Sequence, residues 1–317
     1  MVIAVTGASG FIGRHLVAHL GARGVEVVTV RRPFEREALR TALRGAHAIA
    51  HLAGIASALR AEDFFAANVA GTRAVAEAAR DAGIRMIHVS SLAAAGPAPS
   101  GAPRSEDDEP DPRTPYGRSK LESERVLAAM SDLRWLVLRP GIVYGPGDRA
   151  MLPLFRAAAR GFLPLVGHES AAYTVIYIGD LVRALAAALD SDAANLDRVV
   201  MFAGHPRPAS AREILEGMRS AVGARAAIVR VPMPVTRFAA LAGNLVGAAR
   251  GRPMAINTSR YAELAAGGFV CRVDRLRDRL GIVAQIDLKE GLAQTAAWYR
   301  QEKWLERRRS SENSEIG

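Results

Sequence analysis

The sequence predicts an α/β fold, in which a Rossmann-type, doubly wound parallel sheet is followed by a smaller C-terminal substrate lobe. Two observations predict it. Short apolar runs alternate with stretches of helical spacing through the first half of the chain, a pattern typical of a parallel sheet covered by helices on both faces. A glycine-rich turn also lies between the first apolar run and the first helical stretch.

The individual elements follow from hydrophobic periodicity. In the first half, we expect strands at residues 2–5, 25–30, 46–52, 86–89 and 135–138, and helices at 11–23, 35–44, 63–82 and 115–130. After residue 149 we expect helices at 152–160, 179–189, 211–222, 235–249 and 288–304, and strands at 173–178, 199–202 and 228–231. These elements predict a dinucleotide-binding domain at 1–150, a smaller, partly interleaved substrate lobe at 151–306, and a frayed polar tail at 307–317.

One segment, residues 96–115, is rich in proline and acidic residues and cannot form part of the sheet. It directly precedes Tyr116. Two interpretations stay open: a mobile flap at the edge of an active site, or a plain solvated loop.

The composition indicates a basic soluble protein. The net charge is +10, but the basic residues are scattered apart from Arg307, Arg308 and Arg309, and no nucleic-acid-binding motif is present. We therefore expect no nucleic-acid partner. A basic surface would instead attract an anionic substrate or the phosphates of a cofactor.

Cysteine content and hydrophobicity favour the cytoplasm. Cys271 is the single cysteine, so neither an intramolecular disulfide nor a zinc site built on paired cysteines can form, and no metal is expected. The N-terminus does not resemble a signal peptide, and no apolar run is long enough to span a membrane, so no membrane partner is expected. The apolar stretch 235–249 is interrupted by Arg237 and Gly243. We predict a buried helix there, with membrane contact as the weaker alternative.

The glycine-rich turn has the chemistry of an anion site. Gly7, Gly10 and Gly13 follow GxxGxxG spacing between a strand and a helix. A backbone without Cβ atoms can bend sharply and approach a pyrophosphate, and the helix N-terminus offers free N–H groups and a positive dipole end. The second strand ends in Arg31 and Arg32 rather than in an acidic residue. Guanidinium groups match a 2′-phosphate, so the sequence predicts NADP in preference to NAD.

Tyr116 and Lys120 lie four residues apart at the start of a predicted helix, and therefore on one helical face. A tyrosine has an ordinary pKa of about 10, and a nearby ammonium group favours its phenolate form. Such a pair behind a dinucleotide-binding turn predicts proton transfer.

With these motifs, the chain resembles an extended or atypical short-chain dehydrogenase/reductase of the NAD-dependent epimerase/dehydratase family. The motifs occur in the family's order: TGASGFIG from residue 6, HLAG from 51, NVAGT from 68, VSS from 89, YGRSK from 116, and RPGIVYGP from 139. The resemblance covers nearly the whole chain. Many members of the family dimerise through a helix bundle, so a homodimer is an expectation.

The resemblance implies a role for each matching residue. Tyr116 would be the general acid/base, Lys120 would lower its pKa and bind the nicotinamide ribose, and Ser91 would hydrogen-bond the reacting oxygen. His51 is expected in the core or behind the site. Together with the turn and the two arginines, the expected cofactor-binding residues are Gly7, Ser9, Gly10, Phe11, Ile12, Gly13, Arg31, Arg32, Leu52, Ala53, Gly54, Asn68, Tyr116, Lys120, Pro140 and Val143.

Three departures from the family pattern bear on the ligands. Ile142 stands where sugar-nucleotide members carry an asparagine, and Tyr173 where they often carry an arginine. Both replace a polar contact to a diphosphate by an apolar or aromatic surface. Only about 20 residues separate Val30 from His51, so an extra strand of the adenine pocket is predicted to be truncated.

The leading hypothesis is an NAD(P)-dependent oxidoreductase that transfers hydride at a secondary alcohol or ketone of a small organic substrate. The alternatives are a nucleotide-sugar epimerase or dehydratase, and a non-catalytic NAD(P)-binding sensor or assembly factor. The intact set of Ser91, Tyr116 and Lys120 argues against the sensor.

Overall fold

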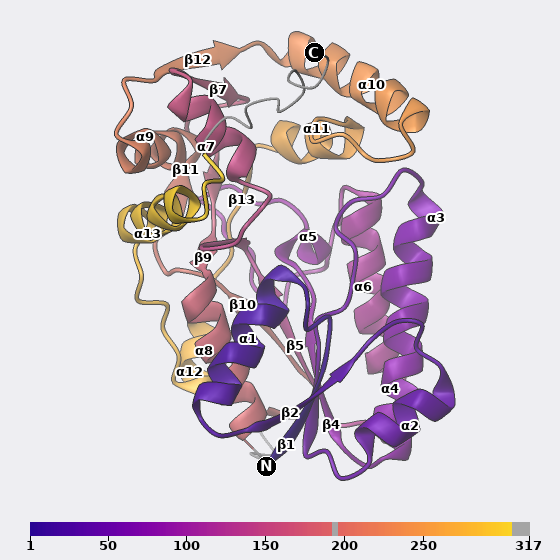
Figure 1. Cartoon of the computed structure of the whole chain (residues 1–317). Coiled ribbons are helices and arrows are strands. Elements are labelled where there is room, and N and C mark those ends of the chain that lie inside the picture. Colours follow the sequence, from indigo (N-terminus) through magenta and orange to yellow (C-terminus); the bar gives the residue numbers. More distant parts are fainter. Residues whose placement is uncertain (192–195, 306–317) are drawn as a thin grey trace, which may run out of the picture.

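Six parallel strands form the central sheet of the computed structural model, which describes residues 1–191 and 196–305. The predicted tail at 307–317 lies outside the described residues. The strands are β1 (Val2–Thr6), β2 (Glu26–Val30), β3 (Ala48–His51), β4 (Arg85–Val89), β5 (Trp135–Pro140) and β10 (Val199–Ala203), in the spatial order β10-β5-β4-β3-β1-β2 (Figure 1). The Rossmann-type sheet is thus confirmed.

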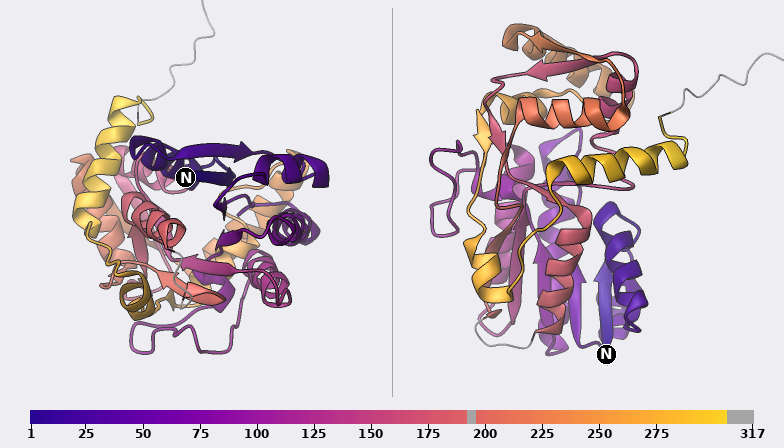
Figure 2. Two further views of the ribbon diagram at one scale, coloured as in Figure 1. Left: turned by 90° about the horizontal axis from the view of Figure 1, so that it is seen from below. Right: turned by 90° about the vertical axis from the view of Figure 1, so that its left-hand side faces the viewer.

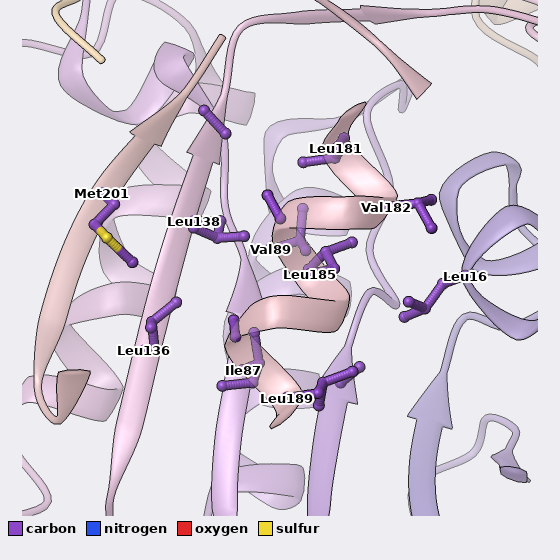
Figure 3. Close-up of a cluster of buried hydrophobic side chains, with 14 of the residues drawn as sticks. Leu16, Ile87, Val89, Leu136, Leu138, Leu181, Val182, Leu185, Leu189 and Met201 are labelled. Atoms are coloured by element: carbon purple, nitrogen blue, oxygen red, sulfur yellow. The ribbon is translucent and has the colours of Figure 1, made fainter. Parts of the chain in front are cut away.

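Helices cover both faces of this sheet, as its apolar strands require. One face carries α1 (Phe11–Ala22) and α8 (Ile178–Asp190), and the other carries α2 (Arg36–Leu43), α4 (Gly71–Asp81) and α6 (Pro115–Ala128). Figure 3 shows the first interface, where Leu181, Leu185 and Leu189 of α8 lie against side chains of β4 and β5. These leucines recur every four residues, which places them on one side of the helix.

The long helix expected at 63–82 is divided into three segments. They are α3 (Ala61–Phe64), a π-helix η1 (Phe65–Ala70) and α4. Asn68 lies buried in the π-helical segment. Its side chain hydrogen-bonds to the backbone of Ile55, in the loop after β3, and not to its own helix. A π segment of this kind is frequent at functional sites.

The second lobe is built on short strands and five further helices (Figure 2). Its strands form three small sheets, with the strand orders β12-β7, β11-β8-β13 and β6-β9. The strands are β6 (Ile142–Tyr144), β7 (Phe162–Val166), β8 (Ala172–Tyr173), β9 (Val175–Tyr177), β11 (Ala209–Ser210), β12 (Ala227–Val231) and β13 (Gly268–Phe269). The helices are α7 (Leu152–Ala159), α9 (Ala211–Val222), α10 (Met233–Ala249), α11 (Thr258–Ala265) and α13 (Leu288–Gln301). Three later elements return to the central sheet: α8, β10, and α12 (Asp274–Leu280), which packs against both of them.

The single strand expected at 173–178 was wrong. The segment changes partner at Thr174, so Tyr173 ends β8, residues 175–177 form β9, and Ile178 already begins α8. The hydroxyl of Thr174 accepts a hydrogen bond from the amide of Cys271, which fixes the crossover between the two small sheets.

The prediction of a buried helix at 235–249 was also wrong. Helix α10 buries only small or polar residues, Thr236, Ala240 and Gly247. Phe238 and Leu245 are each 74% exposed. Among the described residues, no helix has the length and hydrophobicity needed to cross a bilayer.

The acidic segment 96–115 is tied to both lobes. Ala98 and Arg104 form backbone bridges with Phe269 and Cys271. The carboxylate of Glu106 accepts a hydrogen bond from the amide of Phe202 in β10, and Asp107 pairs with Arg275 at 2.7 Å. These contacts anchor the segment, which argues against both a plain solvated loop and a mobile flap.

Helix α6 approaches the short helix α5 (Leu92–Ala95) very closely at Gly117. A Cβ atom at this position would lie 2.4 Å from the carbonyl oxygen of Ala93. Thr114 caps α6 by accepting from the amide of Gly117 at 3.1 Å, and Pro115 occupies the first turn, where its missing N–H costs nothing. The cap and the glycine together fix how α6 enters the site.

We expect Gly117→Ala to lower the free energy of unfolding by about 1–3 kcal/mol, because the methyl group forces the two helices apart. Chemical denaturation would measure it. Gly21→Ala is the matched control in α1, where an added Cβ meets nothing within 4 Å and should be neutral or stabilising. Equal stability of Gly117→Ala and the wild type would contradict the close approach.

Candidate active site

The glycine turn forms a cradle with no room for side chains. Gly7 has φ of +68°, and a Cβ there would lie 2.8 Å from the amide nitrogen of Ala53. A Cβ on Gly13 would lie 2.1 Å from the carbonyl oxygen of Gly7. Gly10 caps α1, no side chain caps the helix, and its first turn holds no acidic residue, so N–H groups remain free. This cradle fits the pyrophosphate of a dinucleotide.

The other residues expected around the cradle lie at the same edge of the sheet. Ser9 is in the turn, Phe11 and Ile12 begin α1, and Leu52 directly follows β3. The Thr6 hydroxyl accepts hydrogen bonds from the amides of Leu52 and Ala53, both at 3.2 Å. This contact fixes the end of β3 against the turn.

His51 is a core residue, as expected. Its ring contacts the hydroxyl of Thr6 at 2.8 Å and that of Thr72 at 3.1 Å, and it stacks on His88 with ring centroids 5.3 Å apart. Burial lowers the pKa of His51 to about 3, and the ammonium of Lys120 acts in the same direction. The imidazole is therefore neutral and structural.

Asn68 links the loop after β3 to α6. Its amide oxygen accepts from the amide of Ile55 at 2.8 Å, and its amide nitrogen donates to the carbonyl of Ile55 and to Ser119. A Cβ on Gly54 would lie 3.0 Å from the Asn68 amide oxygen and 4.0 Å from Lys120 Nζ. The loop after β3 thus lies between the glycine turn and α6. Contact of Asn68 with a cofactor stays a prediction.

Ser91 and Tyr116 are brought together by the approach of α5 and α6. Ser91 caps α5, accepting from the amide of Ala93 at 3.2 Å. Burial raises the pKa of Tyr116, and the nearby side chain of Ser91 partly offsets that rise. The phenol is therefore protonated at neutral pH.

Lys120 lies buried one turn further along α6. Its ammonium donates to the carbonyl of Val89 at 2.7 Å, at the end of β4. Burial lowers the pKa of Lys120 to about 8, whereas Glu124 raises it. The expected lowering of the Tyr116 pKa by Lys120 stays a prediction, since burial dominates the pKa of the phenol.

The sequence reasoning missed a buried ion pair beneath the site. Arg139 donates to the carboxylate of Glu124 at 2.6–3.1 Å, and Ser90 hydrogen-bonds the same carboxylate. Both charged side chains are almost fully buried. The sequence feature that could have indicated this ion pair is the position of Glu124, four residues after Lys120 on the same face of α6.

A second missed residue, Glu263, reaches the site from α11. It pairs with Arg260 at 3.0 Å, and burial raises its pKa. Its charge contributes to the raised pKa values of Tyr116 and Tyr173. No sequence motif marks α11, so this wall of the site emerges only from the fold.

The opposite end of the site lies along β2. Within residues 1–191 and 196–305, no strand pairs with the outer side of β2, so β2 is the edge of the sheet and the predicted truncation is confirmed. Arg31 and Arg32 are exposed just after this strand. An open groove of about 460 Å³ begins there, lined by Arg32, Pro33, Phe34, Asp63, Ala66, Ala67, Ala70, Gly71 and Ala74.

The remaining expected residues lie at the junction of the lobes. Pro140 ends β5, and Val143 pairs with Ile176 between β6 and β9. Ile142 is 37% exposed, and Tyr173 lies near Arg260 and Glu263 of α11.

Among the described residues, no cluster of His, Cys, Asp or Glu side chains is arranged to hold a metal ion.

Comparisons with known proteins agree with this geometry. The chain is 31% identical to the ceramide reductase of Caulobacter vibrioides (strain NA1000 / CB15N), over 96% of each chain. It is 29% identical to the 4-hydroxy-2-methyl-3-oxo-4-farnesyl-3,4-dihydroquinoline-1-oxide ketoreductase of Stigmatella aurantiaca, over 91% of this chain and 93% of the relative. The solved structure of MoeE5 in complex with UDP-glucuronic acid and NAD matches 95% of this chain and 100% of that one, with 27% identity and a TM-score of 0.76.

A family model described as NAD dependent epimerase/dehydratase family matches residues 3–201. The match contains the glycine turn, the loop after β3, and the helix that carries Tyr116 and Lys120. The predicted fold class, family and NAD(P)-dependent enzyme are therefore confirmed. The chain belongs to the NAD dependent epimerase/dehydratase family.

Proposed function

We propose that the protein is an NADP(H)-preferring reductase that converts a ketone of a small apolar molecule into a secondary alcohol. The observation that carries this proposal is the placement of Ser91 beside a buried, protonated Tyr116, one helical turn from Lys120, whose ammonium lies at the loop that also borders the glycine turn. A phenol that keeps its proton at neutral pH is suited to donate it, which is the direction required for reduction.

The chain's own residues supply binding and proton transfer. Gly7, Gly10 and Gly13 would hold the pyrophosphate, and bound NAD(P)H would supply a hydride to the carbonyl carbon of the substrate. Ser91 holds the carbonyl oxygen, and Tyr116 donates its proton to that oxygen as the C–O double bond becomes single. The ammonium of Lys120 stabilises the phenolate that remains until a proton from solvent restores it.

The preference for NADP rests on Arg31 and Arg32. Both guanidinium groups are exposed at the end of the edge strand, and Arg32 also lines the groove over η1 and α4. Residues 29–32 contain no carboxylate that would repel a phosphate. This arrangement favours a ligand that carries a 2′-phosphate.

The apolar substrate is supported by the walls of the site. Ile142 and Tyr173 replace polar contacts to a diphosphate, and Arg260 is already paired with Glu263. Two relatives carry names that denote reduction of a ceramide and of a farnesylated quinoline, both with long apolar groups. The nucleotide-sugar complexes of MoeE5 keep a sugar-nucleotide epimerase as the alternative. Net oxidation of NADPH by an apolar ketone would distinguish the reductase.

We further propose that the protein is cytoplasmic and forms a homodimer. The buried Cys271 has a pKa raised to about 12 by burial, so it fits a structural thiol in the reducing cytoplasm. A homodimer is carried over from the family resemblance.

We expect Tyr116→Phe to lower kcat for ketone reduction by about 10²–10⁴-fold, because the proton donor is removed while the ring is kept. Loss of nicotinamide absorbance would measure it. The affinity for NADPH, measured by fluorescence titration, should change little. Tyr299→Phe is the matched control, since its hydroxyl contacts Asp148 in the second lobe. Full activity of Tyr116→Phe would favour the non-catalytic sensor.

We expect Arg31→Gln combined with Arg32→Gln to raise KM for NADPH about 10²- to 10⁴-fold, because the two charge-assisted contacts together contribute roughly 3–6 kcal/mol. KM for NADH should stay nearly constant. Arg44→Gln, at the exposed end of α2, serves as the control. A wild-type preference for NADH of tenfold or more would overturn the assignment of both arginines.

A further inference from the structure

Helix α10 turns its apolar side toward solvent. Its small buried face, Thr236, Ala240 and Gly247, packs inward. The opposite side carries large apolar residues at helical spacing, with the exposed fractions Val235 55%, Phe238 74%, Leu241 47% and Leu245 74%. A surface helix of a globular protein normally shows the reverse pattern. A contiguous exposed apolar face of this kind marks an interaction site.

The surroundings of this face are basic. Between Glu216 and Glu263 the sequence contains seven arginines and no acidic residue. Arg237, Arg250 and Arg252 are exposed on α10 or directly after it. Within the part of the chain that the structure describes, none of these three has an acidic partner within ion-pair distance, whereas exposed arginines such as Arg40, Arg60 and Arg212 do. An apolar face bordered by unpaired cations complements an apolar layer beneath anionic headgroups.

We propose that the outward face of α10 docks onto the surface of an anionic phospholipid bilayer. Phe238, Leu241 and Leu245 enter the boundary between headgroups and acyl chains, and Arg237, Arg250 and Arg252 contact the headgroup phosphates. The helix has 17 residues and includes Arg237, so it lies in the plane of the interface and does not cross it. A second copy of the chain is a poor partner for this face, because the same arginines would oppose one another.

The docking face lies over the active site. Helix α10 lies outside α11, which carries Glu263 (Figure 1). A Cβ on Gly247 would lie 3.5 Å from Leu59, which follows the cofactor loop and is 44% exposed. Docking would therefore bring the border of the site to the bilayer, where apolar ketones accumulate. This consequence rests on the proposed reductase function, whereas docking itself does not.

Flotation of the full-length chain with lipid vesicles tests the docking without cofactor or substrate. One set of vesicles contains phosphatidylglycerol and phosphatidylcholine in equal parts, and the other contains phosphatidylcholine alone. We expect the protein to float with the anionic set, and less so as salt is raised. Phe238→Ser combined with Leu245→Ser should lower the partition coefficient about tenfold or more, because two large apolar groups no longer enter the membrane.

The controls separate docking from folding and from catalysis. Val283→Ser changes an exposed apolar residue on the other lobe and should bind like the wild type. Every variant keeps residues 306–317, so their three arginines contribute equally. Unchanged melting temperature and NADPH binding would show that the α10 variant is folded, and its reduction of a short water-soluble ketone reports on the proposed function separately. The proposal would be overturned if the wild type did not float, or if the wild type and the α10 variant floated equally. It would also be overturned if the wild type formed dimers that the variant lost while neither bound vesicles, because the face would then be an interface between two copies.

Discussion

The active site depends on close backbone-to-backbone contacts, which are possible only because glycines occupy the positions of contact. Gly13 lets the glycine turn close on itself, Gly7 lets it meet the loop after β3, and Gly117 lets α6 meet α5. Each contact leaves less room than a methyl group needs. The first two leave the N-terminus of α1 open to an anion, and the third brings Tyr116 against Ser91. The positions of the glycine turn and of Tyr116 are thus set by close backbone packing.

Buried polar groups then hold these backbones in place. Thr6 bonds the loop after β3, Asn68 bonds the same loop to α6, and Lys120 bonds α6 to the end of β4. Beneath them, Glu124 and Arg139 form a buried ion pair. A buried polar group without partners is costly, so such networks fix a single arrangement. The hydroxyl of Ser91 and the phenol of Tyr116 are therefore set before a substrate arrives.

Much of this was predictable from the sequence, and the exceptions have physical reasons. Periodicity located the long elements, such as α9 at Ala211–Val222, and the glycine spacing located the cradle. Strands of two or three residues, such as β8 and β13, are too short for a periodic signal. Composition made α10 look buried, because only tertiary packing decides which face of an apolar helix is covered. The charge of Glu263 raises the pKa of Tyr116 although 147 residues separate them in the sequence, an interaction that no local pattern encodes.

The most direct test of the central claim is a crystal structure of the full chain with NADP⁺ bound. The account predicts that the pyrophosphate lies on the N-terminus of α1 against Gly10, that Arg31 and Arg32 contact the 2′-phosphate, and that Ser91 and Tyr116 face the nicotinamide ring together. A nicotinamide ring directed away from Tyr116, or a glycine turn too closed to admit the pyrophosphate, would contradict it.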